Sequence, residues 1–269
     1  MVIINGLGGI MKEIAFFDID NTLLSHSTHC VPQSTINALK KLKSLGKKCF
    51  IATSRSYVEI TNLPKEVMEL MDGFICEGGA KVIYHDEVII RHVMDEPSKN
   101  RLIQLIRDHH LAYRYCGLDI HINYLDHEDE FASKRFYELY EMVPEVVPYT
   151  TQPLTHILFY CFDDMLAHQI INEIPRLEVI RIGEAFDVTD KDVTKGSALK
   201  QICHHFNVPL ANTVCFGDSA NDIEMIKAAG LGIAMGNGNK SVQRFANYVT
   251  SDIDDNGIYN ACVYFNWFR

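Results

Sequence analysis

The sequence predicts an α/β protein with a parallel, doubly wound sheet that is interrupted by an inserted α+β lobe. Near the start of the chain, short apolar runs alternate with amphipathic segments. Strand and helix patterns in strict alternation are typical of a parallel sheet. Near Lys81 the alternation gives way to irregular extended and helical runs, and it returns after Thr189. In a parallel sheet, functional residues gather at the carboxyl ends of the strands.

The first part of the chain predicts three buried strands, at residues 14–17, 49–52 and 73–76. Between them, residues 33–45 carry apolar side chains at helical spacing and Gly46 closes the helix. A second helical stretch is expected up to about Met71. Residues 82–84 and 88–93 then predict a hairpin.

The middle and last parts complete the expected order. The middle part predicts helices at 98–109, 130–140 and 165–174 and extended runs at 112–115, 120–125, 157–162 and 177–182. The last part predicts helices at 195–206 and 219–229 and strands at 213–216 and 231–235. We therefore expect a core domain of residues 12–84 and 188–269, a cap of residues 85–187, and a disordered extension at residues 1–11, which lack the features of a signal peptide.

Composition limits the partners and the compartment. The 25 Lys and Arg residues against 35 Asp and Glu residues give a formal net charge of −10, which argues against nucleic acid or an anionic membrane as a partner. No apolar segment is long enough to span a bilayer. The eight cysteines form no Cys-x-x-Cys pair, so we expect buried free thiols and a cytoplasmic protein.

The segment Asp18-Ile19-Asp20-Asn21-Thr22 follows the first predicted strand. Side chains at positions i and i+2 of an extended chain point the same way, so the two carboxylates would repel each other. A hard dication with oxygen ligands, most simply Mg²⁺, removes that conflict. An aspartate can also act as a nucleophile toward phosphorus. The segment therefore predicts a metal-assisted phosphoryl site.

Three later segments fit the same chemistry. Thr53 ends the second strand and offers a hydroxyl group to phosphate. Lys195 lies at a helix start, where its ammonium group and the helix amides would bind phosphoryl oxygens. Asp218 would join an Asp18 oxygen and the Asp20 backbone carbonyl as a Mg²⁺ ligand. In this hypothesis Asp18 attacks phosphorus and Asp20 is the general acid and base.

These segments, in this order, resemble the four motifs of the haloacid dehalogenase (HAD) superfamily of phosphatases, and the Cof-type branch in particular. The resemblance rests on residues 16–22, 51–55, 193–196 and 216–222, with further similarity at 234–237 and 255–257. It implies a Rossmann-like core, a large α/β cap between the second and third motifs, and Mg²⁺-dependent hydrolysis of small phosphate esters. The chain departs from the pattern at Ser54, where glycine is usual, and at Gly78, where asparagine is frequent.

Other polar residues near the motifs have two interpretations each. Asn221 is expected to help bind phosphate, and Asp222 either approaches the metal and Lys195 or completes a capping box with Ser219. Arg55 either contacts phosphate or substrate, or pairs at the surface. We interpret His26 and His29 as solvated or hydrogen-bonded loop histidines, because a His-x-x-His pair without further ligands is a weak metal signal.

The function that these predictions favour is a Mg²⁺-dependent phosphatase of small phosphorylated metabolites. Sugar phosphates, nucleotides and phosphorylated cofactors all fit. Two alternatives remain at this point: a phosphomutase that returns the phosphoryl group to a sugar, and a non-enzymatic sensor of phosphorylated ligands. The presence of Asp18, Asp20, Thr53, Lys195 and Asp218 together favours an enzyme.

Overall fold

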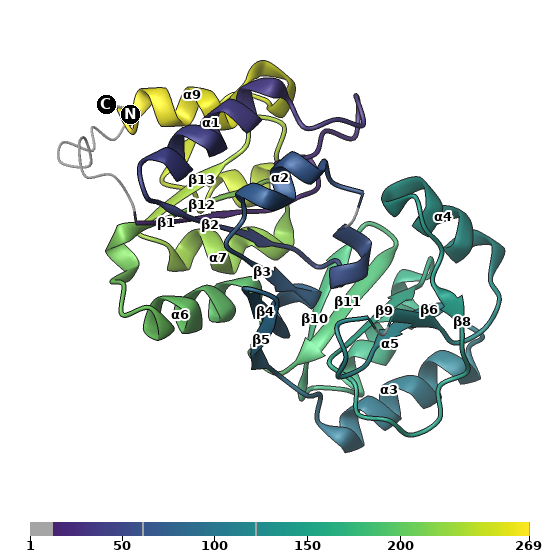
Figure 1. The fold of residues 1–269 in the computed structure, drawn as a ribbon. Coiled ribbons are helices and arrows are strands. Elements are labelled where there is room, and N and C mark those ends of the chain that lie inside the picture. The colour runs from purple at the N-terminus through teal and green to yellow at the C-terminus, as the bar shows by residue number, and fades with distance from the viewer. Residues whose placement is uncertain (1–12, 61, 122, 269) are drawn as a thin grey trace. The chain divides into compact units, whose positions relative to one another are not determined.

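The computed structural model describes residues 13–60, 62–121 and 123–268 (Figure 1). The extension expected at residues 1–11 lies outside these ranges. The chain divides into two compact units. Of the described residues, the first holds 13–52, 63–74 and 199–268, and the second holds 53–60, 62, 75–121 and 123–198.

The main sheet has the strand order β14-β13-β12-β1-β2-β3-β4-β5. Its strands are β1 (Ile14–Phe17), β2 (Lys48–Ala52), β3 (Gly73–Cys76), β4 (Lys81–Tyr84), β5 (Glu87–Arg91), β12 (Thr213–Gly217), β13 (Leu231–Ala234) and β14 (Tyr248–Val249). Strand β1 pairs in parallel with both β2 and β12. The predicted parallel sheet is therefore confirmed, with the β4–β5 hairpin antiparallel at its edge.

Helices cover both faces of the parallel strands in the first unit (Figure 1). One face carries α1 (Gln33–Ser44), α2 (Lys65–Leu70) and α9 (Gly257–Tyr264), and the other carries α7 (Ile223–Ala228). A parallel strand with helices on both sides has to be apolar throughout. All four residues of β1 are accordingly buried, and Phe17 stacks on Phe216 of β12 at a centroid distance of 5.2 Å. A short helix, α8 (Lys240–Gln243), precedes β14.

Two expected helices differ from the structure. The stretch expected up to Met71 is broken into a 3₁₀ turn at Tyr57–Ile60 and α2, because Pro64 lacks the amide hydrogen that a continuous helix needs. The helix expected from residue 219 begins as a 3₁₀ turn at Ala220–Asp222. The C-terminal helix α9 was not expected from the sequence, although it buries Ile258, Ala261 and Cys262.

The second unit is built on an antiparallel sheet with the order β10-β11-β9-β6-β7-β8. Its strands are β6 (Tyr113–Cys116), β7 (Asn123–Leu125), β8 (Glu145–Val146), β9 (His156–Tyr160), β10 (Leu177–Ile182) and β11 (Ala185–Asp190), and only β7 and β8 pair in parallel. Its helices are α3 (Glu96–Asp108), α4 (Glu130–Tyr140) and α5 (Asp164–Asn172). Helix α6 (Lys195–His205) begins in this unit and ends in the first one.

The two faces of this antiparallel sheet differ in chemistry. Ile157 and Phe159 of β9 pack with apolar residues of α3 and α5 in one core cluster. Leu158 and Tyr160 point the other way, where Phe136 of α4 packs against them. The alternation follows from the two-residue period of a strand. The second face also carries polar side chains, which become important for the candidate site.

The cysteine prediction is confirmed for seven residues, which are free and buried, but it is wrong for Cys30, which is free and exposed. Burial raises the pKa of the Cys49 thiol to about 12, so this sulfur stays protonated at neutral pH. Among the helices of the described ranges, none has the length and apolar character needed to cross a membrane.

Truncation of Phe136 tests the packing of α4. Phe136 is 0% exposed and its neighbour Tyr137 is 64% exposed. We expect Phe136→Ala to lower the free energy of unfolding by about 3–5 kcal/mol, because it leaves a cavity against Leu158 and Tyr160. The control Tyr137→Ala should change it by less than about 0.5 kcal/mol. Urea unfolding followed by circular dichroism measures both, and equal losses would contradict the packing of Phe136 against Leu158 and Tyr160.

Candidate active site

Three buried carboxylates form a compact acidic group in the first unit. Asp18 follows β1 and Asp218 follows β12, and these neighbouring strands are parallel, so both residues leave the sheet at the same edge. One carboxylate oxygen from each of Asp18, Asp218 and Asp222 lies within 4.8 Å of the other two. The three residues are 4%, 9% and 0% exposed. The convergence expected for Asp18 and Asp218 is thus present in the structure.

Asp222 is held in the group by the backbone of the preceding turn. Its Oδ2 accepts the N–H of Asp218 at 2.9 Å and that of Ser219 at 3.0 Å. A side chain at Gly217 would collide with Asp222, since a Cβ atom there would lie 2.5 Å from the Asp222 Cβ. The capping interpretation of Asp222 is therefore confirmed, and the same geometry brings its carboxylate to Asp18 and Asp218. Asn221 is buried beside them, and its Oδ1 accepts the Ser219 hydroxyl at 2.6 Å.

The donor set of this group fits a hard divalent cation. Two backbone amides partly compensate the charge of Asp222, but three carboxylates still share a buried space. Like charges at that separation raise the free energy of the ionised state unless a cation lies among them. Carboxylate oxygens are the ligands that Mg²⁺ prefers. The acidic group is therefore a candidate metal centre.

The loop after β1 carries the second aspartate of the motif. The Asp20 side chain is not a member of the acidic group; its Oδ1 lies 2.7 Å from Nε2 of His26. Asn21 has a φ of 56°, a left-handed conformation that asparagine tolerates better than most residues. The Asn237 amide donates to the Asn21 carbonyl at 2.8 Å and accepts the Ile253 N–H at 2.9 Å. Asn237 thereby ties this loop to the C-terminal part of the first unit.

Thr53 and Lys195 both belong to the second unit. Two adjacent glycines lie between them in space: Gly78 contacts Thr53, and Gly79 contacts the residue before Lys195. The Gly78 N–H donates to the Thr53 carbonyl at 3.1 Å. Gly79 has a φ of 116° and lies so close to the Thr194 carbonyl that a Cβ atom would approach its oxygen to 2.3 Å. Thr194 caps α6, with its hydroxyl oxygen accepting the Ser197 N–H at 3.1 Å, and Lys195 follows as a buried first helical residue. The Thr53 hydroxyl oxygen itself accepts the Arg55 N–H at 3.1 Å.

Arg55 is a buried residue, so the surface-pairing interpretation does not describe it. Its Nη1 donates to the Glu59 carbonyl at 3.1 Å and to Asn62 Oδ1 at 2.8 Å. The guanidinium group also lies over the Tyr140 ring, 4.6 Å from its centroid. These contacts fix the loop that follows Thr53.

The same loop is joined to the antiparallel sheet by a buried carboxylate, Glu59. Glu59 accepts the Ser56 N–H at 2.6 Å and the Asn123 amide at 2.9 Å, and it pairs with Arg114 of β6 at 3.3 Å. Both charged side chains are 0% exposed. A buried ion pair of this kind depends on both partners, because either one alone would be an uncompensated charge.

A second buried carboxylate, Asp187, extends the network. Arg114 Nη1 donates to His156 Nδ1 at 2.7 Å, and the opposite ring nitrogen, Nε2, contacts Asp187 Oδ1. Because a guanidinium group only donates, Nδ1 is the acceptor and Nε2 carries the hydrogen that Asp187 accepts. Burial by itself would raise the pKa of the Asp187 carboxyl group. His156, a hydrogen bond from Ser54 and the charge of Arg114 outweigh burial and hold that pKa below its ordinary value.

Sequence reasoning missed the network of Glu59, Arg114, His156 and Asp187. The available signal was a charged or imidazole side chain inside an otherwise apolar strand, as in Tyr113-Arg114-Tyr115 and His156-Ile157-Leu158. The structure also explains one departure from the motif pattern. Gly78 has a φ of 64°, and a Cβ atom there would lie 3.1 Å from Asp187 Oδ2, so this position favours glycine.

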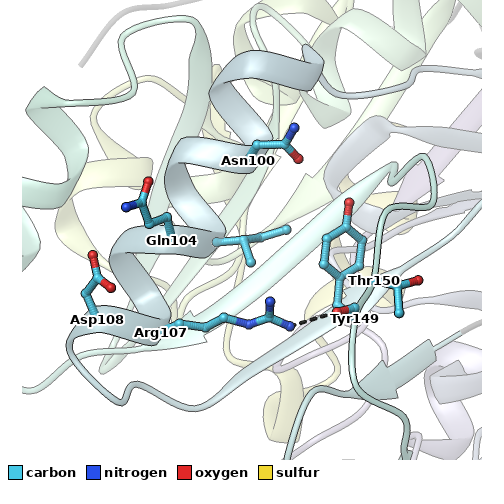
Figure 2. A pocket seen from close by; sticks show the side chains of 7 residues that line it. Asn100, Gln104, Arg107, Asp108, Tyr149 and Thr150 are labelled. Atoms are coloured by element: carbon cyan, nitrogen blue, oxygen red, sulfur yellow. Dashed lines mark hydrogen bonds between the residues drawn. The ribbon is translucent and has the colours of Figure 1, made fainter.

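The second unit also has an open recess of about 290 Å³, lined by residues of α3 and by Tyr149 and Thr150 (Figure 2). Arg107 points into it, but its Nη2 donates to Asp126 at 2.6 Å and to the Tyr149 carbonyl at 2.8 Å. The recess contains none of the residues that the sequence singled out. The candidate metal centre, formed by Asp18, Asp218 and Asp222 in the first unit, therefore lies outside this recess.

Comparison with known proteins identifies similar chains and similar folds. Residues 15–262 match the family model described as haloacid dehalogenase-like hydrolase. An HMP-PP phosphatase of Yersinia pseudotuberculosis is 28% identical over 249 residues, which cover 84% of this chain and 85% of that protein. The solved HAD subclass IIB sugar phosphatase BT4131 is 31% identical with a TM-score of 0.89, covering 95% of this chain and 99% of that one. The phosphatase BT1666 of Bacteroides thetaiotaomicron is 28% identical with a TM-score of 0.82, covering 99% and 98%.

The chain therefore belongs to the haloacid dehalogenase-like hydrolase family. Within that family it is a hydrolase of the phosphatase type, with the core and inserted cap of the Cof-type, subclass IIB branch.

Replacement of Asp187 tests the ionised state of the buried network. The folded carboxyl pKa lies below that of the unfolded chain, so its contribution is fully present above about pH 4 and is lost as the pH falls through the folded pKa. We expect Asp187→Asn to lower the free energy of unfolding at pH 7 by about 3–5 kcal/mol. The difference in free energy of unfolding between the variant and the unchanged protein should become smaller below about pH 4.

Urea unfolding at pH 7, 5, 4 and 3.5 measures this gap, with the exposed Asp108→Asn as the control for loss of one carboxylate. A gap of the same size at every pH would show that the Asp187 charge does not stabilise the fold.

Proposed function

We propose that this protein is a Mg²⁺-dependent phosphatase that hydrolyses small phosphorylated metabolites through an aspartyl-phosphate intermediate on Asp18. The acidic group of Asp18, Asp218 and Asp222 carries the proposal, since buried carboxylates at neighbouring strand ends fit a divalent cation. When bound, the metal would neutralise charge and align the phosphoryl group. Asp18, Asp218 and the Asp20 backbone carbonyl would supply its protein ligands, with Asp222 fixing the turn behind them.

Each side chain has its own role in the proposed reaction. Asp18 attacks phosphorus while Asp20 gives a proton to the leaving oxygen, and Asp20 later takes a proton from the water that hydrolyses the intermediate. Lys195, at the capped start of α6, and the Thr53 hydroxyl bind phosphoryl oxygens. The Thr53 oxygen accepts the Arg55 N–H, which leaves the hydroxyl hydrogen to donate to phosphate. Asn221 would add an amide donor, and Arg55 would act by fixing the Thr53 loop.

Sugar phosphates are the first substrate class to test. The similar proteins include a sugar phosphatase, whose structure has a TM-score of 0.89, and an HMP-PP phosphatase, so sugar phosphates and HMP-PP both belong in the panel. Release of inorganic phosphate, rather than formation of an isomeric sugar phosphate, distinguishes hydrolysis from phosphomutase activity.

Removal of the nucleophile gives the direct test. We expect Asp18→Asn to lower phosphate release from 4-nitrophenyl phosphate or a sugar phosphate with Mg²⁺ by roughly 10³-fold or more, because the amide cannot form the covalent intermediate. Thermal unfolding should show that the variant remains folded. Full activity in a folded Asp18→Asn protein would refute the assignment.

Loss of the second strand-end carboxylate tests the metal. We expect Asp218→Asn to raise the Mg²⁺ concentration for half-maximal activity by roughly 10- to 100-fold, because a charged oxygen ligand becomes neutral. The matched control is Glu224→Gln, which removes an exposed carboxylate from the following helix. The proposed metal site would be contradicted if the unchanged enzyme, Asp218→Asn and Glu224→Gln all required the same Mg²⁺ concentration for half-maximal activity. Activity that survives exhaustive chelation of metal would contradict it as well.

A further inference from the structure

The contact between Asp20 and His26 lies within the first unit and none of the expected roles includes it. Nε2 of His26 is 2.7 Å from Asp20 Oδ1, and the two side chains are 38% and 31% exposed. The loop that presents His26 is fixed at several points. Ser25 N–H donates to the Cys30 carbonyl at 3.0 Å, and the Ser27 hydroxyl donates to Asp254.

The Asn21 amide determines which imidazole nitrogen carries the hydrogen. Asn21 Oδ1 accepts the His26 backbone N–H at 3.2 Å, which orients the amide. Its Nδ2 then faces His26 Nδ1 at 3.5 Å as a donor, so Nδ1 is the acceptor of the neutral ring. Nε2 consequently bears the hydrogen and donates it to Asp20. The neutral ring is sufficient for this arrangement.

We propose that His26 is a positioning residue that orients the Asp20 carboxyl group for proton transfer to the leaving group. The proposal rests on the role of Asp20 in the proposed function. When Asp20 is protonated, the oxygen that accepts the imidazole N–H is its carbonyl-type oxygen, because the other oxygen then carries the hydrogen and is the poorer acceptor. His26 therefore assigns Oδ1 as the acceptor and Oδ2 as the oxygen that carries the transferable hydrogen.

The proton balance of the step follows from this assignment. As the Asp18 carboxylate forms its bond to phosphorus, the bond between phosphorus and the ester oxygen breaks with its electron pair on that oxygen. The hydrogen on Asp20 Oδ2 passes to the same oxygen, which leaves as an alcohol, and Asp20 becomes a carboxylate. Water then attacks phosphorus and gives a proton to the Asp20 carboxylate, while the bond between phosphorus and the Asp18 oxygen breaks with its electron pair on that oxygen. Inorganic phosphate leaves, Asp18 is again a carboxylate, and the His26 N–H remains on Oδ1 throughout.

Leaving-group dependence distinguishes orientation from a merely structural role. A general acid matters most for poor leaving groups, so its loss steepens the plot of log kcat/KM against the pKa of the leaving phenol. Aryl phosphates of similar size, from 4-nitrophenyl to phenyl phosphate, provide that series with Mg²⁺ present.

Asparagine and glutamine at position 26 give the decisive pair of variants. The glutamine amide nitrogen reaches about as far as Nε2, whereas the asparagine amide nitrogen reaches only as far as Nδ1. We expect His26→Asn to lower kcat/KM for phenyl phosphate by about 10-fold or more, which is a part of the roughly 10²- to 10⁴-fold that general acid catalysis supplies. For 4-nitrophenyl phosphate, whose leaving group needs less protonation, kcat/KM should change by less than about 3-fold. His26→Gln should retain the slope of the unchanged enzyme.

The exposed neighbour His29 provides the matched control, since His29→Asn makes the same substitution in the same loop. Equal losses for all aryl phosphates in His26→Asn, or an unchanged or faster reaction, would overturn the positioning role. Asp20→Asn separates this failure from that of the proposed function. If the plot of log kcat/KM against leaving-group pKa is steeper in Asp20→Asn but not in His26→Asn, Asp20 is the general acid and only the positioning role of His26 is overturned. If the slope in Asp20→Asn is that of the unchanged enzyme, Asp20 is not the general acid, and the positioning role of His26 falls with it.

Discussion

Mutual repulsion of buried carboxylates is the constraint on which the candidate site depends. Asp18 and Asp218 are brought together because they end two neighbouring parallel strands, and Asp222 is added by the turn that follows. The protein compensates part of this charge itself, with the Asp218 and Ser219 amides on Asp222. A buried cluster of like charges is costly to maintain in a fold, and a cation among the three carboxylates would lower that cost.

Within the second unit, close backbone approach positions the start of α6. Gly79 allows the Thr194 carbonyl to lie where a side chain would otherwise stand, and this contact places the start of α6 beside the segment that hydrogen-bonds Thr53. The position of Lys195 therefore depends on the absence of a side chain more than one hundred residues earlier in the chain. Such fixed placement suits the phosphate-binding role proposed for Lys195 and Thr53, because catalysis by alignment requires rigidly held groups.

The sequence was sufficient for the parts of the fold that follow from local pattern. Strand β1, strand β12 and the convergence of Asp18 with Asp218 could be predicted, because apolar runs identify buried strands and parallel neighbours end at one edge. Strand β11 was not predicted, because Asp187 and Thr189 interrupt its apolar residues. The pairing of Glu59 with Arg114 was also out of reach, since the partners are 55 residues apart and local pattern says nothing about such distances. His26 was correctly interpreted as a hydrogen-bonded loop residue, but its partner Asp20 required coordinates.

The buried ionic network beneath the Thr53 loop has an evolutionary consequence. Glu59 depends on Arg114, Arg114 also donates to His156, and His156 donates to Asp187, so each side chain compensates the next one. A single replacement strands a charge in the interior, whereas a coordinated replacement by apolar side chains need not. Substitutions at these four positions should consequently covary among descendants of this sequence. Chimaeric proteins that exchange the strands carrying Arg114, His156 and Asp187 but keep residues 53–62 should fold poorly.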